Sequence, residues 1–507
     1  MQPDYSQPVA DYPRYQGKNS PTRTAYLDGA ESCTYEELDE RSNRVANALI
    51  SLGCQPGDRV VYLGVNSGPY VEVFFGACKA KTVYTGINWR LTPVELDYIF
   101  NDAAAKVVFC DPQFLKMLEG MRASIPSLEQ VISVDLAGFT RWRDQHSTAD
   151  PALEHRADDA IVQFYTSGTT GKPKGVVITN QAMEASRRSE DRYGNWFLQG
   201  SRDEVTINAM PNFHIAGLEW LLIGLFRSAK VVLMAAPDPA AFLDLIETEK
   251  ATHLFAVPVV LAMMLEEQKK TPRDLSSLKV FHYGASPAAP AVLREAIKLM
   301  GCGFSQYYGM TEVNGIAVVL SPDDHDLANP ERLKSCGKAA PGMLIKICDP
   351  DGNELAPNMP GEIWVKTDSL MKEYWNNPQA TAEVCVNGWY KSGDGGYLDE
   401  DGFLYMSDRI KDMVISGGEN IYPTEVENAL YEHPSIAEVA VVGVADEKWG
   451  EAVKAVAVLK PGLHAGEEEL IEFLRERLAG YKIPRIYNFV SELPRTASGK
   501  IQKYKLR

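Results

Sequence analysis

The sequence predicts an α/β protein with a large N-terminal domain of two helix-flanked sheets plus a β-rich subdomain, followed by a small α+β C-terminal domain. Three observations predict this class. The chain has 507 residues, which is more than one ordinary domain. Strand-like and helix-like segments alternate over residues 1–160 and 229–330, and this βαβ rhythm is typical of parallel sheets covered by helices. Between about 340 and 408, short strands and glycine-rich turns replace that rhythm.

The first βαβ units can be followed along the chain. Runs of β-branched residues bounded by turn residues predict strands, and apolar or amphipathic runs predict helices. The helix over 92–103 has the clearest start, because Thr92 can act as its N-cap and Glu95 completes a capping box. The predicted strands are 58–66, 82–88 and 106–110, and the predicted helices are 68–80 and 92–103.

The second run of βαβ units leads into the β-rich region and then into the C-terminal domain. We place the N-terminal domain at residues 1–408 and the C-terminal domain at 409–507. The last segment, 482–507, holds seven basic residues and a single acid, Glu492. Such a segment is either a solvated basic tail or an element that moves onto an anionic ligand. Further strands are predicted in KVVLM (230–234), THLFAVP (252–258) and KVFHYG (279–284).

Composition and charge exclude several classes of protein. With 45% hydrophobic and 23% charged residues, the chain is neither disordered nor fibrous. The formal net charge of −17 disfavours nucleic-acid partners, because an acidic surface repels phosphate backbones. Eight cysteines without a CxxC pair favour a reduced compartment. No signal peptide and no apolar run of membrane-spanning length is found, so we expect a soluble, cytoplasmic protein.

A loop rich in glycine and hydroxyl residues lies at 165–176, between two strand-like segments, with the sequence YTSGTTGKPKGV. Glycines allow backbone N–H groups to close around phosphate oxygens, and small hydroxyls add donors without bulk. The loop is not a Walker motif, because Pro173 and a following strand stand where that motif has a helix. The pattern predicts a phosphate-binding loop that contains Thr166, Ser167, Gly168, Thr169, Thr170, Gly171, Lys172 and Lys174.

Further segments follow this loop in order: PNFHIAG (211–217), YGASP (283–287), SQYYGMTE (305–312), WYKSGDGGYLDEDGFLYMSDR (389–409), SGGENIYP (416–423) and PRTASGKIQK (494–503). Together with the loop, they resemble the motifs of the adenylate-forming (ANL) superfamily. This superfamily contains acyl-CoA synthetases, carrier-protein adenylation domains and firefly-type luciferases. The resemblance covers nearly the whole chain, and the acyl-CoA synthetase branch is the one that the chain resembles most.

The resemblance implies how ATP and Mg²⁺ are bound. Tyr308 is expected to stack on the adenine, Thr311 to bond a phosphate oxygen, and Glu312 to help hold Mg²⁺. A carboxylate oxygen is the kind of ligand that this hard cation prefers. Asp394 is expected to accept hydrogen bonds from the ribose hydroxyls, with Arg409 as a second ribose contact. The other expected nucleotide contacts are Ala285, Ser286, Tyr307 and Gly309.

The resemblance also implies two half-reactions and a mobile C-terminal domain. In the first, a carboxylate attacks the α-phosphorus of ATP and pyrophosphate leaves, with Lys500 as the catalytic lysine and His214 beside the acid. In the second, a thiol attacks the acyl-adenylate and AMP leaves. Rotation about a hinge at Lys411 would withdraw Lys500 and bring in a segment that lines a pantetheine tunnel. That segment contains Gly417, Gly418 and Glu419.

The acid is expected to be hydrophobic. Relatives that load amino acids place an Asp directly after the Phe of the 211–217 motif, and this chain has His214 there. The expected wall segments 220–226, 255–260 and 316–320 are apolar. A medium- or long-chain fatty acid is the first candidate, and an aryl or cyclic acid is the alternative. ATP, Mg²⁺ and coenzyme A are the expected cofactors and co-substrates.

Other functions stay open on the sequence alone. A separate carrier protein could replace free CoA as the thiol, and a luciferase-type oxygenase would share every motif. ATP-dependent phosphotransfer is disfavoured, because no kinase HRD or DFG motif is present. A purely structural or binding role would leave all of these motifs without a use. The expected partners are the small molecules carboxylic acid, ATP and CoA; a homo-oligomer stays open, because the sequence does not predict an oligomeric state.

Overall fold

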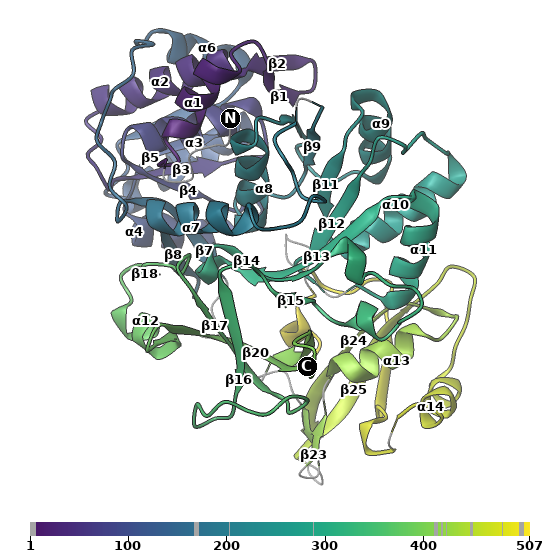
Figure 1. Cartoon of the computed structure of the whole chain (residues 1–507). Coiled ribbons are helices and arrows are strands. Elements are labelled where there is room, and N and C mark those ends of the chain that lie inside the picture. Colours follow the sequence, from purple (N-terminus) through teal and green to yellow (C-terminus); the bar gives the residue numbers. More distant parts are fainter. Residues whose placement is uncertain are drawn as a thin grey trace.

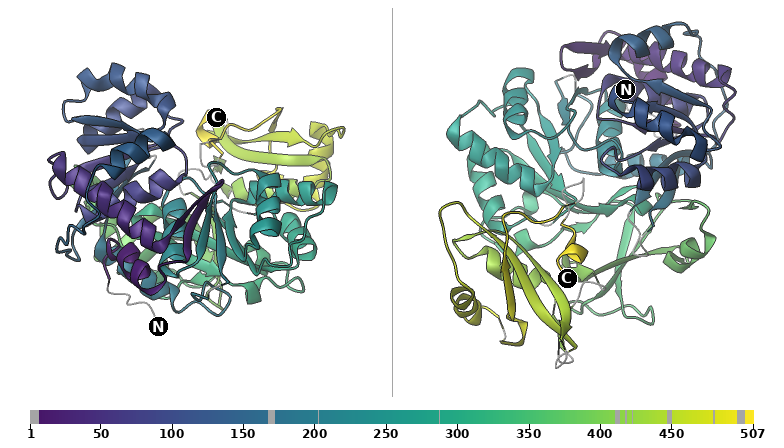
Figure 2. Two further views of the ribbon diagram at one scale, coloured as in Figure 1. Left: turned by 90° about the horizontal axis from the view of Figure 1, so that it is seen from above. Right: turned by 180° about the vertical axis from the view of Figure 1, so that it is seen from behind.

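The computed structural model describes residues 7–507, apart from 167–171, 202, 287, 410–413, 417, 418, 422, 447–449, 479 and 496–500. Figure 1 shows a large region built from three sheets and a smaller C-terminal unit with a sheet of its own. In the two further views the C-terminal unit again lies to one side of the large region (Figure 2). The α/β class with a large N-terminal and a small C-terminal part is therefore confirmed.

The first sheet carries the hairpin that flanks the predicted phosphate loop. In spatial order its strands are β18 (Glu373–Tyr374), β8 (Lys174–Thr179), β7 (Ala160–Thr166), β4 (Val83–Gly86), β3 (Arg59–Leu63), β5 (Ala105–Cys110) and β6 (Gln130–Ser133). β7, β4, β3, β5 and β6 are parallel, and β8 returns antiparallel to β7. Parallel neighbours need crossover connections, which α3 (Gly68–Lys79) and α4 (Pro93–Ala103) provide.

The second sheet has nine strands and shares one continuous hydrophobic core with the first. Its strands from β13 to β1 are parallel, and antiparallel strands extend both ends. In spatial order the strands are β15 (Lys338–Ala339), β14 (Gly315–Leu320), β13 (Gly303–Met310), β12 (Val280–Gly284), β11 (His253–Ala256), β9 (Val205–Asn208), β10 (Lys230–Leu233), β1 (Thr24–Asp28) and β2 (Glu31–Thr34).

Helices cover the faces of these two sheets (Figure 1). Their apolar sides enter the cores, as expected for sheets that are buried on both faces. Besides α3 and α4, the N-terminal helices are α1 (Asp11–Asn19), α2 (Tyr35–Ser51), α5 (Leu115–Met121), α6 (Leu136–Asp144), α7 (Asn180–Glu190), α8 (Ile215–Phe226), α9 (Pro239–Glu249), α10 (Pro258–Lys270) and α11 (Pro290–Met300).

The third sheet forms the predicted β-rich region and is antiparallel throughout. The short helix α12 (Pro378–Val384) precedes its strand β19. The strands are β16 (Met343–Cys348), β17 (Gly361–Thr367), β20 (Trp389–Leu398) and β19 (Cys385–Val386), with β21 (Leu404–Arg409) paired to β20.

The C-terminal unit packs around a separate core that runs from Val414 to Ile483. The predicted boundary after residue 408 and the hinge at Lys411 stay predictions. β21 continues to Arg409, and Lys411 lies outside the described residues. The elements of the unit are β22 (Val414–Ser416), β23 (Glu419–Ile421), α13 (Pro423–Tyr431), β24 (Ile436–Asp446), β25 (Gly450–Leu459), α14 (Glu467–Arg475) and β26 (Ile486–Phe489).

The predicted capping box at the start of α4 is present. The Thr92 hydroxyl accepts a hydrogen bond from the Glu95 N–H, and the Glu95 carboxylate accepts one from the Thr92 N–H. The predicted strand over 252–258 is shorter in the structure, because β11 ends at Ala256 and Pro258 begins α10. Proline is well suited to the first turn of a helix, where its missing N–H has no partner to lose.

The 211–217 segment reaches its position through a close contact between α8 and the backbone before it. A Cβ atom on Gly217 would lie 2.2 Å from the Pro211 carbonyl oxygen and 2.6 Å from that of Met210. Only glycine permits this approach, so Gly217 sets the distance between α8 and the turn that carries His214. Within the described residues, no helix is both long and apolar enough to span a bilayer.

Replacing Gly217 with alanine should push α8 away from residues 210 and 211. We expect a loss of about 1–3 kcal/mol in the free energy of unfolding, since the clashing atoms belong to the backbone. Gly120→Ala is a matched control, because nothing lies within 4 Å of its Cβ and the site is in α5. Urea denaturation should show that this control is as stable as the parent protein or more so; equal losses in both variants would contradict the packing argument.

Candidate active site

The predicted adenine contacts lie where strands of the second sheet end. β12 and β13 are parallel, and Gly284 is paired with Tyr307. Because parallel strands end at the same edge of a sheet, the turn of Ala285 and Ser286 lies beside residues 307–309. Ala285 has a φ of 65°, a conformation that residues other than glycine rarely adopt. Such strained turns are concentrated at ligand sites.

The predicted adenine and ribose residues are joined by a hydrogen bond. The Tyr308 hydroxyl donates to Oδ2 of Asp394 over 2.9 Å, linking β13 of the second sheet to β20 of the third. Loss of solvent contact, and then the neighbouring Asp394 carboxylate, raise the pKa of Tyr308 well above its ordinary value. The phenol therefore remains a neutral donor at physiological pH. Asp394 is also the register partner of Arg409 on β21.

The predicted magnesium ligand has a partner that the sequence did not indicate. Glu312 is only 8% exposed, in the short helical turn of Thr311–Val313 that follows β13. Its Oε1 accepts a hydrogen bond of 2.9 Å from the Tyr374 hydroxyl. Burial and the charge of Glu312 raise the pKa of Tyr374, so this phenol stays protonated. Thr311, which is half-buried, lies between the end of β13 and Glu312.

Lysines of the predicted phosphate loop lie over aromatic rings. Thr166 ends β7, Lys174 begins β8, and the two residues are register partners. The pairing of β18 with β8 brings Tyr374 beside Lys174, whose Nζ lies 4.9 Å from the ring centre. Lys172 Nζ lies 5.2 Å from the centre of the Tyr98 ring. Such contacts hold a cation in place without neutralising its charge.

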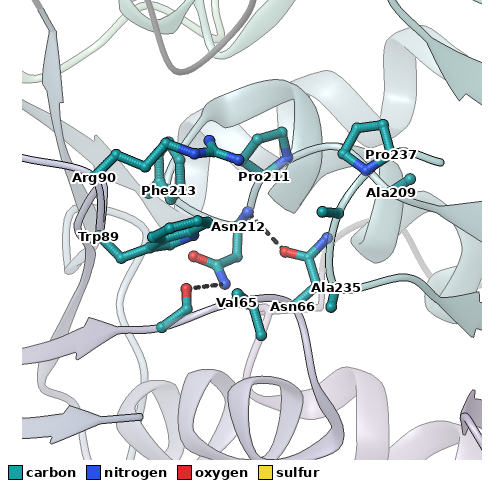
Figure 3. Close-up of a pocket in the computed structure, with 12 residues that line it drawn as sticks. Val65, Asn66, Trp89, Arg90, Ala209, Pro211, Asn212, Phe213, Ala235 and Pro237 are labelled. Atoms are coloured by element: carbon teal, nitrogen blue, oxygen red, sulfur yellow. Dashed lines mark hydrogen bonds between the residues drawn. The ribbon is translucent and has the colours of Figure 1, made fainter. Parts of the chain in front are cut away.

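His214 lies at the junction of the two helix-flanked sheets. It occupies the position before α8, and its ring centre is 4.7 Å from that of Phe213. Figure 3 shows the neighbouring pocket, where Trp89 and Arg90 face the turn that carries Asn212. The Asn212 N–H donates to Oδ1 of Asn66 over 2.9 Å, and its side-chain amide donates to the Gly64 carbonyl over 3.1 Å. These bonds fix the turn before His214 to the first sheet.

Two of the segments expected to line the acid site pack against buried histidines. The Trp220 indole lies 4.8 Å from the ring of His282 and 6.0 Å from that of Phe255, measured between ring centres. The His282 Nδ1 lies 2.7 Å from the Tyr307 hydroxyl, and His253 stacks on the His282 ring. Burial, and to a lesser degree His253, lower the pKa of His282 well below its ordinary value. A neutral imidazole therefore packs against Trp220 of the expected wall.

The remaining predicted site residues lie at strand ends or outside the described part of the chain. Arg409 ends β21 and Glu419 begins β23. The predicted residues that lie outside the described part of the chain are Ser167, Gly168, Thr169, Thr170, Gly171, Lys411, Gly417, Gly418 and Lys500.

Known proteins resemble this chain over nearly its full length. The model of the AMP-binding enzyme family matches residues 14–375, and that of the AMP-binding enzyme C-terminal domain matches 425–500. The fatty acid–[acyl-carrier-protein] ligase ScoC of Streptomyces coeruleorubidus is 38% identical, covering 97% of this chain and 94% of that protein. The feruloyl-CoA synthase of Amycolatopsis sp is 37% identical, covering 99% of both. The long-chain-fatty-acid–CoA ligase FadD13 of Mycobacterium tuberculosis is 33% identical, covering 97% of both.

Solved structures share the whole fold. ATP-bound MatB from Rhodopseudomonas palustris superposes with a TM-score of 0.90 at 31% identity, covering 99% of this chain and 98% of that one. The o-succinylbenzoate CoA synthetase MenE of Bacillus subtilis, in complex with its acyl-adenylate, gives a TM-score of 0.86 at 32% identity with the same coverage. The fold and the family matches define an adenylate-forming enzyme. The chain belongs to the AMP-binding enzyme family of the ANL superfamily, and the predicted class, an AMP-forming acyl-CoA synthetase, is confirmed at this level.

Tyr374 should tune the magnesium dependence of the enzyme. Tyr374→Phe removes the hydroxyl that donates to Glu312 and keeps the ring under Lys174. We expect adenylate formation to fall about tenfold, the scale of one hydrogen bond to a charged group, and to need more Mg²⁺. Tyr397→Phe is the control, because that ring stacks on Tyr405 in the third sheet. An unchanged Mg²⁺ titration of Tyr374→Phe would contradict the assignment.

Buried histidines should make stability depend on pH. Burial lowers the pKa of His253 from 6.5 to about 4. Below about pH 6.5 the unfolded chain binds a proton that the folded protein excludes, so the free energy of unfolding falls as pH falls towards 4. The loss is about 1.4 kcal/mol per pH unit for one such group. Denaturation at pH 7.5 and 5.5 should show that the free energy of unfolding depends less on pH in His253→Gln than in the parent protein. The exposed His464→Gln variant should show the same pH dependence as the parent protein.

Proposed function

We propose that the protein is an ATP-dependent carboxylic acid–CoA ligase that forms an acyl-adenylate and then an acyl-CoA thioester. The observation that carries this proposal is the convergence of three expected nucleotide contacts. Tyr308 donates a hydrogen bond to Asp394, and Glu312 lies four residues further along the same chain segment, held by Tyr374. This arrangement suits a nucleotide. The Tyr308 ring can meet the adenine, the Asp394 carboxylate the ribose, and the buried Glu312 carboxylate a phosphate-bound cation.

The first half-reaction joins two anions, so its barrier is largely electrostatic and positional. The acid's carboxylate oxygen attacks the α-phosphorus, and the bond to the pyrophosphate oxygen breaks. Lys172 and Lys174 lie at the end of the loop that would hold the leaving phosphates. Lys500 would balance charge at the α-phosphate, and His214 would orient the acid.

Mg²⁺ fits the residues present. This ion usually takes one or two protein carboxylates and completes its shell with waters and substrate phosphates. The single buried carboxylate of Glu312 meets that need, and within the described residues no group of three or more His, Cys, Asp or Glu side chains forms a cage. When bound, the ion would offset the charge of the phosphates. The hydroxyl of Tyr374 donates a hydrogen bond to the Glu312 carboxylate and so orients it.

The second half-reaction needs different groups around the same carbonyl. The thiol sulfur attacks the carbonyl carbon of the adenylate, its proton passes to solvent or base, and AMP leaves. Rotation of residues 409–507 about Lys411 would remove Lys500 and bring in Gly417, Gly418 and Glu419. The separate core of the C-terminal unit supports movement as a rigid body.

The acid is proposed to be hydrophobic. FadD13 is named for long-chain fatty acids and the Amycolatopsis relative for a feruloyl group, so the relatives include both kinds. A fatty acid remains the first candidate. The second candidate, an aryl acid, is favoured by the name of the Amycolatopsis relative, a feruloyl-CoA synthase.

Free CoA is the proposed thiol, with a carrier protein as the alternative that the name of ScoC suggests. The two alternatives share the adenylation step, so only the identity of the thiol acceptor distinguishes them. Thioester formation with CoA at a rate comparable to that with an acyl-carrier protein would support the first.

The experiment that tests the function is a pyrophosphate-release screen over acids of graded chain length and ring content, with and without CoA. Lys500→Ala should reduce release by about 10²–10³-fold, the cost of removing one well-placed charge donor. Lys505→Ala is the control, because this exposed residue lies in the same basic segment. If none of the tested carboxylic acids supported pyrophosphate release, the proposed function would be overturned.

A further inference from the structure

Both stems of the predicted phosphate loop touch one helix. Tyr165 precedes Thr166 at the end of β7, and Pro173 precedes Lys174 at the start of β8. Helix α4 packs against both positions through Tyr98 and Asp102. These two residues are four apart, so they lie on the same face of the helix.

Each side chain of this face holds one stem. The Tyr98 hydroxyl donates a hydrogen bond of 3.3 Å to the Pro173 carbonyl. The Tyr165 hydroxyl donates one of 2.6 Å to Oδ2 of Asp102. The Tyr98 ring also lies under the Lys172 ammonium group, so the same side chain contacts two successive loop residues.

The helix is itself firmly anchored. Its opposite face buries Leu96, Ile99 and Phe100 in a core that includes strands β3 and β5, and the Thr92 capping box fixes its first turn. The Asp102 carbonyl accepts a hydrogen bond of 2.9 Å from the Trp375 indole, on the segment that follows Tyr374. α4 therefore offers a rigid support.

Tyr165 is held from a second side as well. The Gln163 amide donates to the Tyr165 hydroxyl over 2.9 Å, and Arg59 Nε donates to Oε1 of Gln163 over 3.1 Å. The Arg59 guanidinium lies 3.5 Å from the Trp375 ring centre. Burial, and then the Asp102 carboxylate, raise the pKa of Tyr165, which keeps its hydroxyl a donor.

We propose that Tyr98 and Asp102 are positioning residues for ATP: they fix the two stems of the phosphate loop so that Thr166, Lys172 and Lys174 are in place before the triphosphate binds. The inference rests on the proposed function in taking this loop as the pyrophosphate site. Donors held in advance lower the reorganisation needed at the moment of reaction.

The two half-reactions give this idea a specific signature. Only adenylate formation involves the β- and γ-phosphates, whereas the thioester step starts from an acyl-adenylate that no longer has them. Loosening the stems should weaken binding of ATP and pyrophosphate and slow the first step, with the second unchanged. A residue that only stabilised the fold would affect both steps alike.

The experiment compares Tyr98→Phe, Tyr165→Phe and Asp102→Ala with the parent enzyme. Each tyrosine change removes one hydroxyl and keeps the ring. Tyr35→Phe is the matched control, because the Tyr35 hydroxyl also donates to a backbone carbonyl, that of Ala229 at 2.7 Å, away from the loop. We expect KM for ATP to rise about fivefold in Tyr98→Phe and Tyr165→Phe, the scale of one hydrogen bond, and to stay constant in the control.

Single-turnover reaction of preformed acyl-adenylate with CoA should keep its parent rate in the two Phe variants. In a double-mutant cycle, Asp102→Ala and Tyr165→Phe together should cost no more than either alone. Equal slowing of both half-reactions, or an unchanged KM for ATP, would overturn the positioning role. Calorimetric titration with pyrophosphate and Mg²⁺ needs no acid, so it tests the positioning role independently of turnover. A lack of turnover with every acid would count against the proposed function and not against the positioning role.

Discussion

The candidate site depends on the geometry of parallel strands, which all end at the same edge of their sheet. β12 ends at Gly284, opposite Tyr307, and β13 continues to Met310, so the turn after β12 lies beside the last residues of β13. The hydrogen bond from Tyr308 to Asp394 then joins this edge to the third sheet. The two sheets also share a hydrophobic core and a backbone bridge between Gly337 and Leu404, and the Tyr308 bond adds a direct link between the expected base and ribose contacts.

Local patterns predicted much of the fold. The helix over 92–103 and its capping box follow from neighbouring residues, and the structure has both. The strand predicted over 252–258 was too long, since Pro258 begins a helix and the apolar run continues into it. An apolar run alone does not separate a buried strand from a buried helix. Strand order and the pairing of β18 with β8 could not be predicted, because they depend on contacts between distant segments.

The candidate site could be predicted only as far as motifs reach. Tyr308, Glu312 and Asp394 were found because they belong to recognisable segments, whereas Tyr374 and Asp102 belong to none. Tyr374 is 62 residues from Glu312, and Asp102 is 63 residues from Tyr165. Their roles arise when strand pairing and helix packing bring them to the loop. The one local signal for the α4 contacts is the spacing of Tyr98 and Asp102, which predicts a shared face without saying what it meets.

Charge is the remaining constraint, because a protein with a net charge of −17 is proposed to bind two anions, a nucleoside triphosphate and a carboxylate. The positive charge must therefore be local. A lysine paired with a carboxylate would have its field largely cancelled, whereas a lysine over a ring keeps it. Lys172 over Tyr98 and Lys174 over Tyr374 follow the second arrangement. The same two tyrosines donate hydrogen bonds to the Pro173 carbonyl and to Glu312, so each ring orients a cation while its hydroxyl orients the framework around the proposed phosphate site.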